Sequence, residues 1–554
     1  MPLFWGKSPR VLIRARLALL LVPVSVGLLS LSLLWSSQTA VPIAHAAGPC
    51  DPVLSNPIVC ENSQPGNPSS EWDINGAGDA NLQGFATDIS VNKGSTVSFK
   101  IKTPATAYRL DIYRMGYYGG MGARKVASIL PSATLPQAQP ACLNDATTGL
   151  IDCGNWSLSA SWATPSTATS GIYFAKLVRT DGTAGSSHIV FVVRDDASTA
   201  DIVFKTSDTT WQAYNDWGGR SLYTGGPAPW GAYKVSYNRP FNTRGDSSTD
   251  FVFNAEYPMV RWLEANGYNT SYITSIDADR YGSQLTQHKM FMSVGHDEYW
   301  SGNERANVEA ARGNGVHLAF FSGNEIFWKT RWEPSIDGSN TAYRTLVTYK
   351  ETHANAVSDP KDPPTWTGTW RDPRFSPPAD GGRPENGLSG TIFMVNGGAS
   401  RQDSIAVPAS YKNLRLWRNT SVSSLAQGQT ASFPAGTLGY EWDVDLDNGA
   451  RPAGLFDLSS NTLNISGDFL LDYGNTYGNG TATHHLTMYK AGSGALVFGA
   501  GTVQWSWGLD PNHDNGSAFT DARMQQATVN LLADMRSQPL TLQSGLVAAT
   551  ASTD

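Results

Sequence analysis

The pattern of apolar and polar positions divides the chain into two regions. Between residues 71 and 197, stretches such as 95–102, 108–113 and 172–178 alternate apolar and polar side chains. A period of two is typical of strands that bury one face. Turns rich in Gly, Ser and Thr separate these stretches. The first region is therefore predicted to be an Ig-like β-sandwich.

From residue 198 onward, short apolar runs alternate with helical patterns. The runs at 202–204, 290–294 and 316–321 are continuous, as expected for buried strands. Helical periodicity follows at 257–266 and 303–312 and again at 522–535. Strands that alternate with helices predict βαβ units. Residues 198–540 are therefore expected to form an α/β domain with a mostly parallel, doubly wound sheet.

Three further segments complete the expected organisation. Residues 437–442 and 495–499 are expected to continue the same sheet, whereas the polar and aromatic residues 210–223 are expected to form a loop. Residues 330–400 are rich in Pro, Asp and Trp and predict a long irregular insertion, which in a compact domain is often functional. Residues 541–554 are expected to be a flexible tail.

The N-terminus has the pattern of a targeting segment. Basic residues between positions 7 and 16 precede an apolar run at 17–34, and Ala44-His45-Ala46 offers a small-residue cleavage site. Residues 1–46 are therefore predicted to be a signal peptide, with an uncleaved anchor helix as the alternative. No later stretch approaches about 18 apolar residues. The protein is expected to be secreted or held in the cell envelope, without a membrane span after cleavage.

All four cysteines lie beyond the predicted cleavage site, and an exported, oxidised protein would pair them. Of the three possible connectivities, the local pairs Cys50–Cys60 and Cys142–Cys153 are the simplest. Residues 47–70 are rich in Pro, Asn, Ser and Gly and are interpreted as a disulfide-stapled entry segment.

Composition and missing motifs narrow the function. The formal net charge of −7 is spread along the chain, so no basic stripe indicates a nucleic-acid partner. The chain contains no P-loop and no Gly-x-Gly-x-x-Gly that opens a helix, which disfavours nucleotide chemistry. No Gly-x-Ser-x-Gly follows a strand, and the α/β region contains no cysteine. A Cys–His nucleophile is therefore excluded.

Polar side chains gather at the ends of the predicted strands. Residues 290–294 lead into Gly295, His296 and Glu298. If the chain stays extended, His296 and Glu298 lie on one face. The carboxyl ends of parallel strands share one rim, so further residues are expected there: Tyr214, Tyr223, Asp277, Asn324, Glu325 and Glu441. The plain alternative is a strand-to-helix turn in which Asp297 or Ser301 caps the following helix.

A metal site is the chemistry that these residues suit best. Glu298 supplies a hard anionic oxygen, and His296 is either a ligand or a nearby base. A free phenol has a pKa of about 10, so a tyrosine becomes a phenolate ligand only beside a strong Lewis acid. Hard oxygen donors favour a ferric ion over Zn²⁺ or Cu⁺. The structural alternatives are aromatic packing for the tyrosines and a buried, hydrogen-bonded imidazole for His296.

Several motifs resemble the C-terminal domain of the N,N-dimethylformamidase large subunit across roughly residues 200–540. The segment before it, with Arg114-Met-Gly-Tyr-Tyr-Gly-Gly120, resembles the β-sandwich that precedes this domain in many relatives. The motifs that carry the resemblance are Trp211-Gln-Ala-Tyr-Asn215, Gly218-Gly-Arg-Ser-Leu-Tyr223, Gly295-His-Asp-Glu-Tyr-Trp-Ser301, Ser322-Gly-Asn324 and Gly439-Tyr-Glu-Trp442.

The resemblance implies an amidohydrolase with one ferric ion, Fe³⁺, that acts on a small amide. It places the metal on Glu298 and two tyrosines, of which Tyr214 and Tyr223 are the first choices. Tyr257 and the pair Tyr117/Tyr118 remain alternatives. The implied catalytic residues are His296, Asn324 and Glu441.

The chain also departs from this family. Dimethylformamidase is cytoplasmic and has a separate small subunit, whereas this chain has the pattern of an exported protein and contains no segment that resembles that subunit. A homo-oligomer or an unknown small subunit is a possible partner. Formamide itself is therefore a doubtful substrate.

Two other functions are compatible with the sequence. A β-sandwich with many tryptophans fits a carbohydrate- or envelope-binding protein on an inactive α/β scaffold. Paired carboxylates such as Glu298 and Glu325 fit a glycan hydrolase, provided that they face each other across about 5–10 Å.

Overall fold

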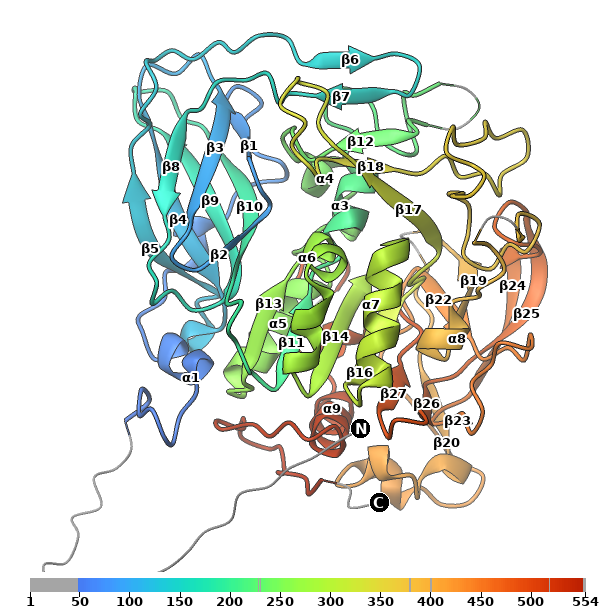
Figure 1. Cartoon of the computed structure of the whole chain (residues 1–554). Helices are drawn as coiled ribbons and strands as arrows, with labels where there is room; N and C mark the ends of the chain where they lie inside the picture. Colours follow the sequence, from blue (N-terminus) through green and yellow to red (C-terminus); the bar gives the residue numbers. More distant parts are fainter. Residues whose placement is uncertain are drawn as a thin grey trace, which may run out of the picture. The chain divides into compact units, whose positions relative to one another are not determined.

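The strand-rich part of the chain that precedes residue 198 forms two sheets that share one core (Figure 1). Phe99 from one sheet and Leu110, Ile112 and Phe191 from the other belong to the same buried cluster. The predicted alternation is found in residues 96–102, whereas residues 110–115 and 171–175 are buried on both faces because their second row of side chains belongs to the main core cluster. The five-stranded sheet consists of β2 (Ser90–Asn92), β10 (Ser186–Arg194), β9 (Gly171–Arg179), β4 (Tyr108–Met115) and β5 (Ala123–Ile129), and the three-stranded sheet of β1 (Gln83–Ala86), β3 (Thr96–Lys102) and β8 (Ala160–Ala163).

Figure 1 is a computed structural model, which describes residues 48–551 except positions 228, 230, 378, 379, 399, 400 and 518. The predicted signal peptide lies outside the described residues. Both predicted disulfides are confirmed, Cys50–Cys60 beside α1 (Pro57–Asn62) and Cys142–Cys153 around the hairpin of β6 (Leu143–Asp145) and β7 (Leu150–Asp152). Among the described residues, no helix has the length and apolar character needed to cross a membrane.

A seven-stranded mixed sheet carries the second region. Its five parallel strands are β13 (Thr270–Ile273), β11 (Ile202–Lys205), β14 (Met290–His296), β16 (His317–Gly323) and β27 (Leu496–Gly499). Two antiparallel strands follow at one edge, β26 (Thr487–Lys490) and β23 (Phe456–Asp457). The sheet is therefore parallel at the strands whose ends carry the predicted site residues and antiparallel at one edge.

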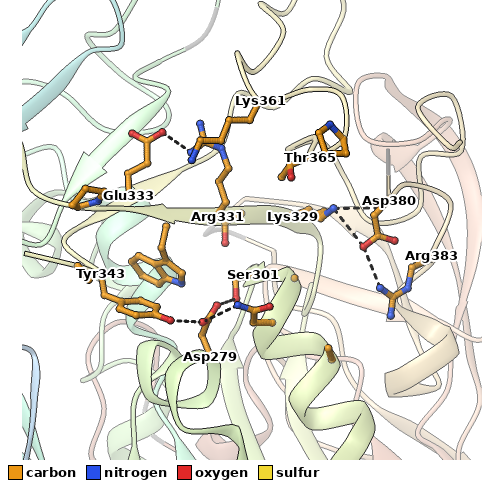
Figure 2. Close-up of a pocket in the computed structure, with 18 of the residues that line it drawn as sticks. Asp279, Ser301, Lys329, Arg331, Glu333, Tyr343, Lys361, Thr365, Asp380 and Arg383 are labelled. Atoms are coloured by element: carbon orange, nitrogen blue, oxygen red, sulfur yellow. Dashed lines mark hydrogen bonds and ion pairs between the residues drawn. The ribbon is translucent and has the colours of Figure 1, made fainter. Parts of the chain in front are cut away.

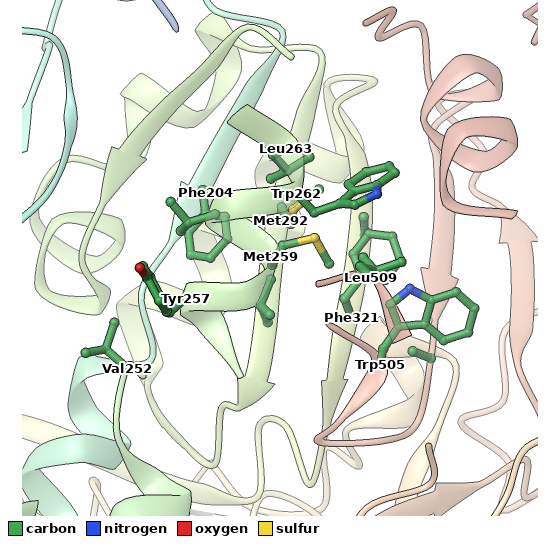
Figure 3. Packing of buried hydrophobic residues seen from close by; sticks show 14 of the residues in the cluster. Phe204, Val252, Tyr257, Met259, Trp262, Leu263, Met292, Phe321, Trp505 and Leu509 are labelled. Carbon is green, nitrogen blue, oxygen red and sulfur yellow. The ribbon is translucent and has the colours of Figure 1, made fainter. Parts of the chain in front are cut away.

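Helices pack on both faces of this sheet because its strands are apolar on both sides. Phe204, Met292 and Phe321 share a buried cluster with Met259 of α5 (Glu256–Ala265) and Leu531 of α9 (Ala522–Asp534), as Figure 3 shows for α5. The neighbouring positions in the strands, Val203, Phe291 and Phe320, belong to a second cluster with residues of α6 (Ser275–Arg280) and α7 (Gly302–Gly313). The continuous apolar runs in the sequence follow from this double burial.

Two smaller four-stranded sheets complete the region. The first consists of β12 (Lys234–Ser236), β18 (Thr345–Val347), β17 (Trp328–Glu333) and β15 (Tyr299–Ser301). The second consists of β22 (Glu441–Val444), β19 (Ile392–Asn396), β24 (Asn461–Leu470) and β25 (Tyr477–His484). The expectation that residues 437–442 continue the main sheet is wrong, since β22 pairs with β19. The strands β20 (Ala406–Pro408) and β21 (Thr430–Ser432) form a separate two-stranded pair.

Two further expectations differ from the structure. The segment expected to be a loop begins with the helix α3 (Asp208–Tyr214), in which residues 208–213 are all buried, so no polar face marks the helix in the sequence. The expected flexible tail packs along α9 over residues 541–551. There the Val547 N–H donates to Gln526 Oε1 at 2.8 Å, and Ala549 is buried.

The remaining short elements connect these layers. They are α2 (Ser69–Trp72), α4 (Thr243–Asp246), α8 (Asn386–Ser389) and the 3₁₀ turns η1 (Tyr118–Gly120), η2 (Ser248–Asp250), η3 (Gly282–Gln287), η4 (Ala409–Tyr411), η5 (Arg415–Trp417), η6 (Ser421–Ser424) and η7 (Trp505–Gly508).

Candidate functional site

The end of β14 presents alternate side chains to two different surroundings. Gly295 has a φ of +81°, a left-handed conformation that glycine adopts without a steric cost. Beyond it, His296 and Glu298 converge, with 3.4 Å between His296 Nε2 and Glu298 Oε2. Asp297 turns the other way, toward Lys205 at 2.7 Å. Ser301, one of the two expected caps, caps α7.

Tyr214 and Tyr223 both reach the Glu298 carboxylate. Tyr214, the last residue of α3, donates to Glu298 Oε2 at 3.1 Å. Tyr223 lies in the loop after α3 and donates to both carboxylate oxygens at 3.0 Å. The two rings stack with centroids 4.4 Å apart. Tyr223 keeps 38 % of its surface exposed, so the buried carboxylate lies directly behind a solvent-exposed ring.

The other tyrosines considered from the sequence lie elsewhere. The Tyr118 hydroxyl donates to Glu61 at 2.8 Å, and the Tyr117 N–H donates to Asn62. Tyr257 packs against Trp72, with ring centroids 6.0 Å apart. The hydrogen bonds to Glu298 therefore favour Tyr214 and Tyr223 as the tyrosine pair.

His296 is held at both ring nitrogens. Its Nδ1 lies 2.7 Å from Asp250 Oδ1, and its Nε2 lies 2.8 Å from Glu441 Oε2. Asn324 Nδ2 lies 3.3 Å from His296 Nε2 and donates to Glu441 at 2.9 Å. Asn324 reaches this position because His296 and Gly323 are register partners in adjacent parallel strands. The structure thus brings together all six predicted site residues.

The backbone of Asn324 is held by a residue of β22. Asn324 has a φ of +45°, which asparagine tolerates better than most residues. Its N–H donates to Asp443 Oδ1 at 2.9 Å, and Asp443 stands two residues after Glu441 on the same strand. One short strand therefore supports two members of the site.

Burial and mutual repulsion set the charge states of the site. Burial, together with the charge of Glu441, raises the pKa of Glu298 to about 7. Burial alone would lower the pKa of His296, but Glu441 and Asp250 outweigh it, so this pKa is raised well above its usual value. Burial and Glu298 raise the pKa of Tyr214 and Tyr223 well above 10. The phenols are therefore neutral donors to Glu298 in the absence of a cation.

Sequence reasoning missed four polar residues of the site. Asp250 ends the turn η2, and Tyr440 donates to it at 3.0 Å. The Tyr299 hydroxyl donates to that of Tyr223. Lys350 places its ammonium 3.4 Å from the centroid of the Tyr223 ring, and burial lowers its pKa to about 7. Tyr299 and Tyr440 carried a signal, because each is a direct neighbour of a predicted glutamate, Glu298 or Glu441, in a motif.

Two residues expected on the rim do not join the site. Asp277 caps α6 together with Thr274 and contacts Arg280. Glu325 accepts a hydrogen bond from Thr391 at 3.1 Å, and burial beside Asp443 raises its pKa well above its usual value. The carboxylate beside Glu298 is therefore Glu441, bridged to it by His296, and not Glu325.

The donor set suits a hard cation. The hydroxyl oxygens of Tyr214 and Tyr223 each lie within 3.1 Å of a Glu298 carboxylate oxygen. Asn324 Oδ1 is buried and has no hydrogen-bond partner among the described residues, as expected of an acceptor next to a site that takes a ligand. Within the same residues, no group of three or more His, Cys, Asp and Glu side chains is arranged to hold a metal ion. The set proposed here differs because two of its three members are tyrosines.

The fold and the site together define an α/β protein with a mixed sheet, whose strand ends bear a buried cluster of phenols, carboxylates and an imidazole. The chain belongs to the family described as N,N-dimethylformamidase beta subunit-like, C-terminal, whose profile matches residues 109–517. The family name indicates an amide hydrolase. The match begins well before residue 200, so it includes part of the strand-rich region.

Other comparisons add little. No curated protein matches the chain. A solved structure of a Paenibacillus sp. cycloisomaltooligosaccharide glucanotransferase complexed with cycloisomaltoheptaose is 8% identical and covers 78% of this chain and 73% of its own, with a TM-score of 0.16. A similarity of this size does not bear on fold or function.

Proposed function

We propose that the protein is an exported, iron-dependent amidohydrolase that cleaves a carbon–nitrogen amide bond. The observation that carries the proposal is the convergence of two tyrosine hydroxyls on one buried carboxylate, beside an imidazole that contacts Glu441. The family name supports amide hydrolysis, and the two disulfides fit an oxidising compartment outside the cytoplasm.

Tyr214, Tyr223 and Glu298 would hold the ferric ion. When bound, it supplies a Lewis acid that polarises an amide carbonyl and lowers the pKa of a bound water. Neutral phenols beside a buried carboxylate ionise only with such a cation nearby, which is why a hard trivalent ion fits them better than a softer one. The same cation would offset the surplus of carboxylates in the site.

His296 and Glu441 would move the proton in this reaction. Because the pKa of His296 is raised, Glu441 would take the proton of the attacking water and His296 would give its own proton to the leaving amine. Glu441 would then return its proton to the imidazole across the 2.8 Å contact. Asp250 at Nδ1 fixes the orientation of the imidazole and stabilises its charged form.

Asn324 would stabilise the oxyanion. Its amide nitrogen lies at hydrogen-bond distance from both Glu441 and His296. A donor of this kind contributes about 3 kcal/mol when it is aimed at the developing charge. The Asp443 carboxylate would position it, since it fixes the Asn324 backbone.

The direct test compares Glu298→Gln with the control Glu325→Gln. Both changes replace a buried carboxyl with an amide of the same shape, but only Glu298 belongs to the donor set. We expect Glu298→Gln to lose bound iron and the visible charge-transfer band of an iron–tyrosinate centre. Glu325→Gln is expected to keep both.

Iron per chain is measured by elemental analysis, and hydrolysis is followed by amine release from a panel of small amides. Stoichiometric iron in Glu298→Gln would contradict the proposal. So would an iron-free wild-type chain that hydrolyses amides at the same rate after exhaustive chelation.

A further inference from the structure

A large pocket lies along β17, and none of the residues around Glu298 lines it. It has a volume of about 850 Å³, within the range of small-ligand sites. Figure 2 shows Arg331 and Glu333 on one side of β17 and the group of Asp279, Ser301 and Tyr343 on the other, with Lys329 directed toward Asp380. The start of α7 and the segments around residues 361–365 and 380–383 close it.

The charged groups of this pocket are largely paired. Lys329 and Arg383 both face Asp380, at 3.5 Å and 3.2 Å. Arg331 is paired with Glu333 and with Asp359 behind the pocket. Because these cations are matched by carboxylates, the pocket offers many hydrogen-bond donors and acceptors but little net field. It therefore suits a neutral polar ligand better than an anion.

One wall of the pocket is aromatic. Trp332 and Tyr343 are half-buried, and their ring centroids lie 5.7 Å apart. The Trp332 Nε1 atom is buried and has no hydrogen-bond partner within the described part of the chain. Tyr343 has a φ of +58°, which is unusual for a bulky residue, and its hydroxyl donates to Asp279 at 2.9 Å. The wall therefore offers flat aromatic surface beside the polar groups of β17.

A second buried polar atom at the pocket also has no partner. Thr330 is 1% exposed, and its Oγ1 has no hydrogen bond to any described residue. Most buried polar atoms are satisfied by protein or ordered water. Thr330 is the register partner of Ser301, whose hydroxyl donates to Asp279. A row of hydroxyl groups, from Tyr343, Thr330 and Ser301, therefore runs from the aromatic wall to the start of α7.

We infer that this pocket binds a neutral saccharide. A hydroxyl group both donates and accepts, so neighbouring hydroxyls can bridge paired ions such as Lys329 and Asp380 without breaking the pair. The C–H face of a sugar ring packs on an aromatic surface such as that of Trp332. This inference does not depend on amide hydrolysis. The pocket begins two residues from the Glu298 site, since β15 contributes Tyr299 to the site and Ser301 to the pocket.

The test measures binding to the intact chain without using hydrolysis. Six-unit cello-, xylo-, manno- and chito-oligosaccharides are titrated by calorimetry and by ligand-observed NMR, with inorganic phosphate and acetate as the anionic arm. We expect at least one neutral oligosaccharide to bind. Trp332→Phe and Asp380→Asn are each expected to weaken that binding about tenfold or more.

Matched controls lie outside the pocket. Trp217→Phe alters a half-buried indole that packs against Trp156, and Asp447→Asn alters an exposed carboxylate. Both are expected to bind as the wild type does. The inference is overturned if no oligosaccharide of the panel binds, if binding is the same in the pocket variants and the controls, or if only phosphate or acetate binds. Iron content measured on the same samples separates this result from the fate of the proposed hydrolysis.

Discussion

Two buried polar clusters lie on opposite sides of the segment 295–301, and they differ in how their charges are balanced. In the lysine cluster, defined here as Lys205, Asp297 and Glu304, the ammonium lies 2.7 Å and 3.0 Å from the two carboxylates. The glutamate cluster is defined here as His296 and the three carboxylates of Asp250, Glu298 and Glu441. All three carboxylates contact the His296 imidazole.

The lysine cluster is a completed structural unit. Lys205 also donates to Ser275 at 3.1 Å and lies 4.6 Å from the centroid of the Trp300 ring. Burial would lower the pKa of Lys205, but Asp297 and Glu304 raise it above its usual value. Every strong charge has a partner, so the cluster fixes the turn that presents His296 and Glu298.

The glutamate cluster is different because carboxylates outnumber the cations close to them. Burial lowers the pKa of the neighbouring Lys350 to about 7, and Asn324 Oδ1 remains unpartnered within the described chain. A buried surplus of negative charge is costly and is retained most readily where a bound cation offsets it. In an extended chain, neighbouring side chains point to opposite sides. Asp297 therefore stabilises the fold through Lys205, while His296 and Glu298 on either side of it form the site.

The largest effect on stability is expected from Lys205→Met. Removing the ammonium leaves the Asp297 carboxylate buried without a cation and the Glu304 carboxyl group without its ion-pair partner, which costs about 3–5 kcal/mol in the free energy of unfolding. Glu298→Gln is expected to change that free energy much less in the metal-free chain, since it removes one of several repelling carboxylates. Urea unfolding of both variants, with the disulfides intact, measures the difference. Equal destabilisation would erase the distinction between the clusters.

A pH dependence of stability is expected from Glu304. Burial raises its pKa in the folded chain to about 8, against roughly 4.3 in the unfolded chain. Between these values the folded chain holds a proton that the unfolded chain has released, so stability falls as the pH rises, by up to about 1.4 kcal/mol per unit. The contribution is complete below pH 4 and is lost by about pH 8.

Glu304→Gln measures the pH-dependent contribution of Glu304 to the free energy of unfolding, because the amide does not titrate. Unfolding free energies of the wild type and the variant at pH 5.5, 7.0 and 8.5 should diverge, with the wild type losing more as the pH rises. Parallel curves would mean that Glu304 is already ionised in the folded chain.

The smallest expected effect belongs to Lys350→Met. The ammonium lies over the Tyr223 ring at 3.4 Å, and such contacts contribute about 1–2 kcal/mol when desolvated. Its loss should slow amide hydrolysis about tenfold and shift an iron–tyrosinate band to longer wavelength, because the phenolate is then less stabilised. Lys361→Met, at an exposed lysine of the saccharide pocket, is the control. An unshifted band in Lys350→Met would mean that Lys350 does not stabilise the Tyr223 phenolate.

The parts of the site that follow parallel strands could be predicted from sequence. His296, Glu298 and Asn324 come directly after apolar runs, and the register of β14 with β16 places them together. Asp250 and Lys350 could not be predicted, because they lie in an irregular turn and after a short strand, where long-range packing alone sets their position. Glu441 is predicted to lie on the rim of the main sheet, and the family resemblance implies its catalytic role, but its strand pairs with β19 in a different sheet.

The errors in the predicted fold also arise where local sequence pattern does not determine the structure. Apolar periodicity found the helices that have one polar face, such as α7, and missed α3, where Thr209, Trp211 and Gln212 are all buried. The direction of the edge strands β26 and β23 had no signal in the sequence, because it depends on a hairpin and on chain connections rather than on local pattern.

The strand β22 has a consequence for how the site can fail. Glu441 reaches His296, while Asp443 grips the peptide nitrogen of Asn324. Both side chains leave the same face of a four-residue strand. If β22 shifted along β19 by one residue, that face would be exchanged for the other. Glu441 would then leave His296, and Asp443 would no longer hold Asn324. A change in the outer sheet that shifts β22 would therefore displace Glu441 and Asp443 together, even if it altered no residue that lines the site.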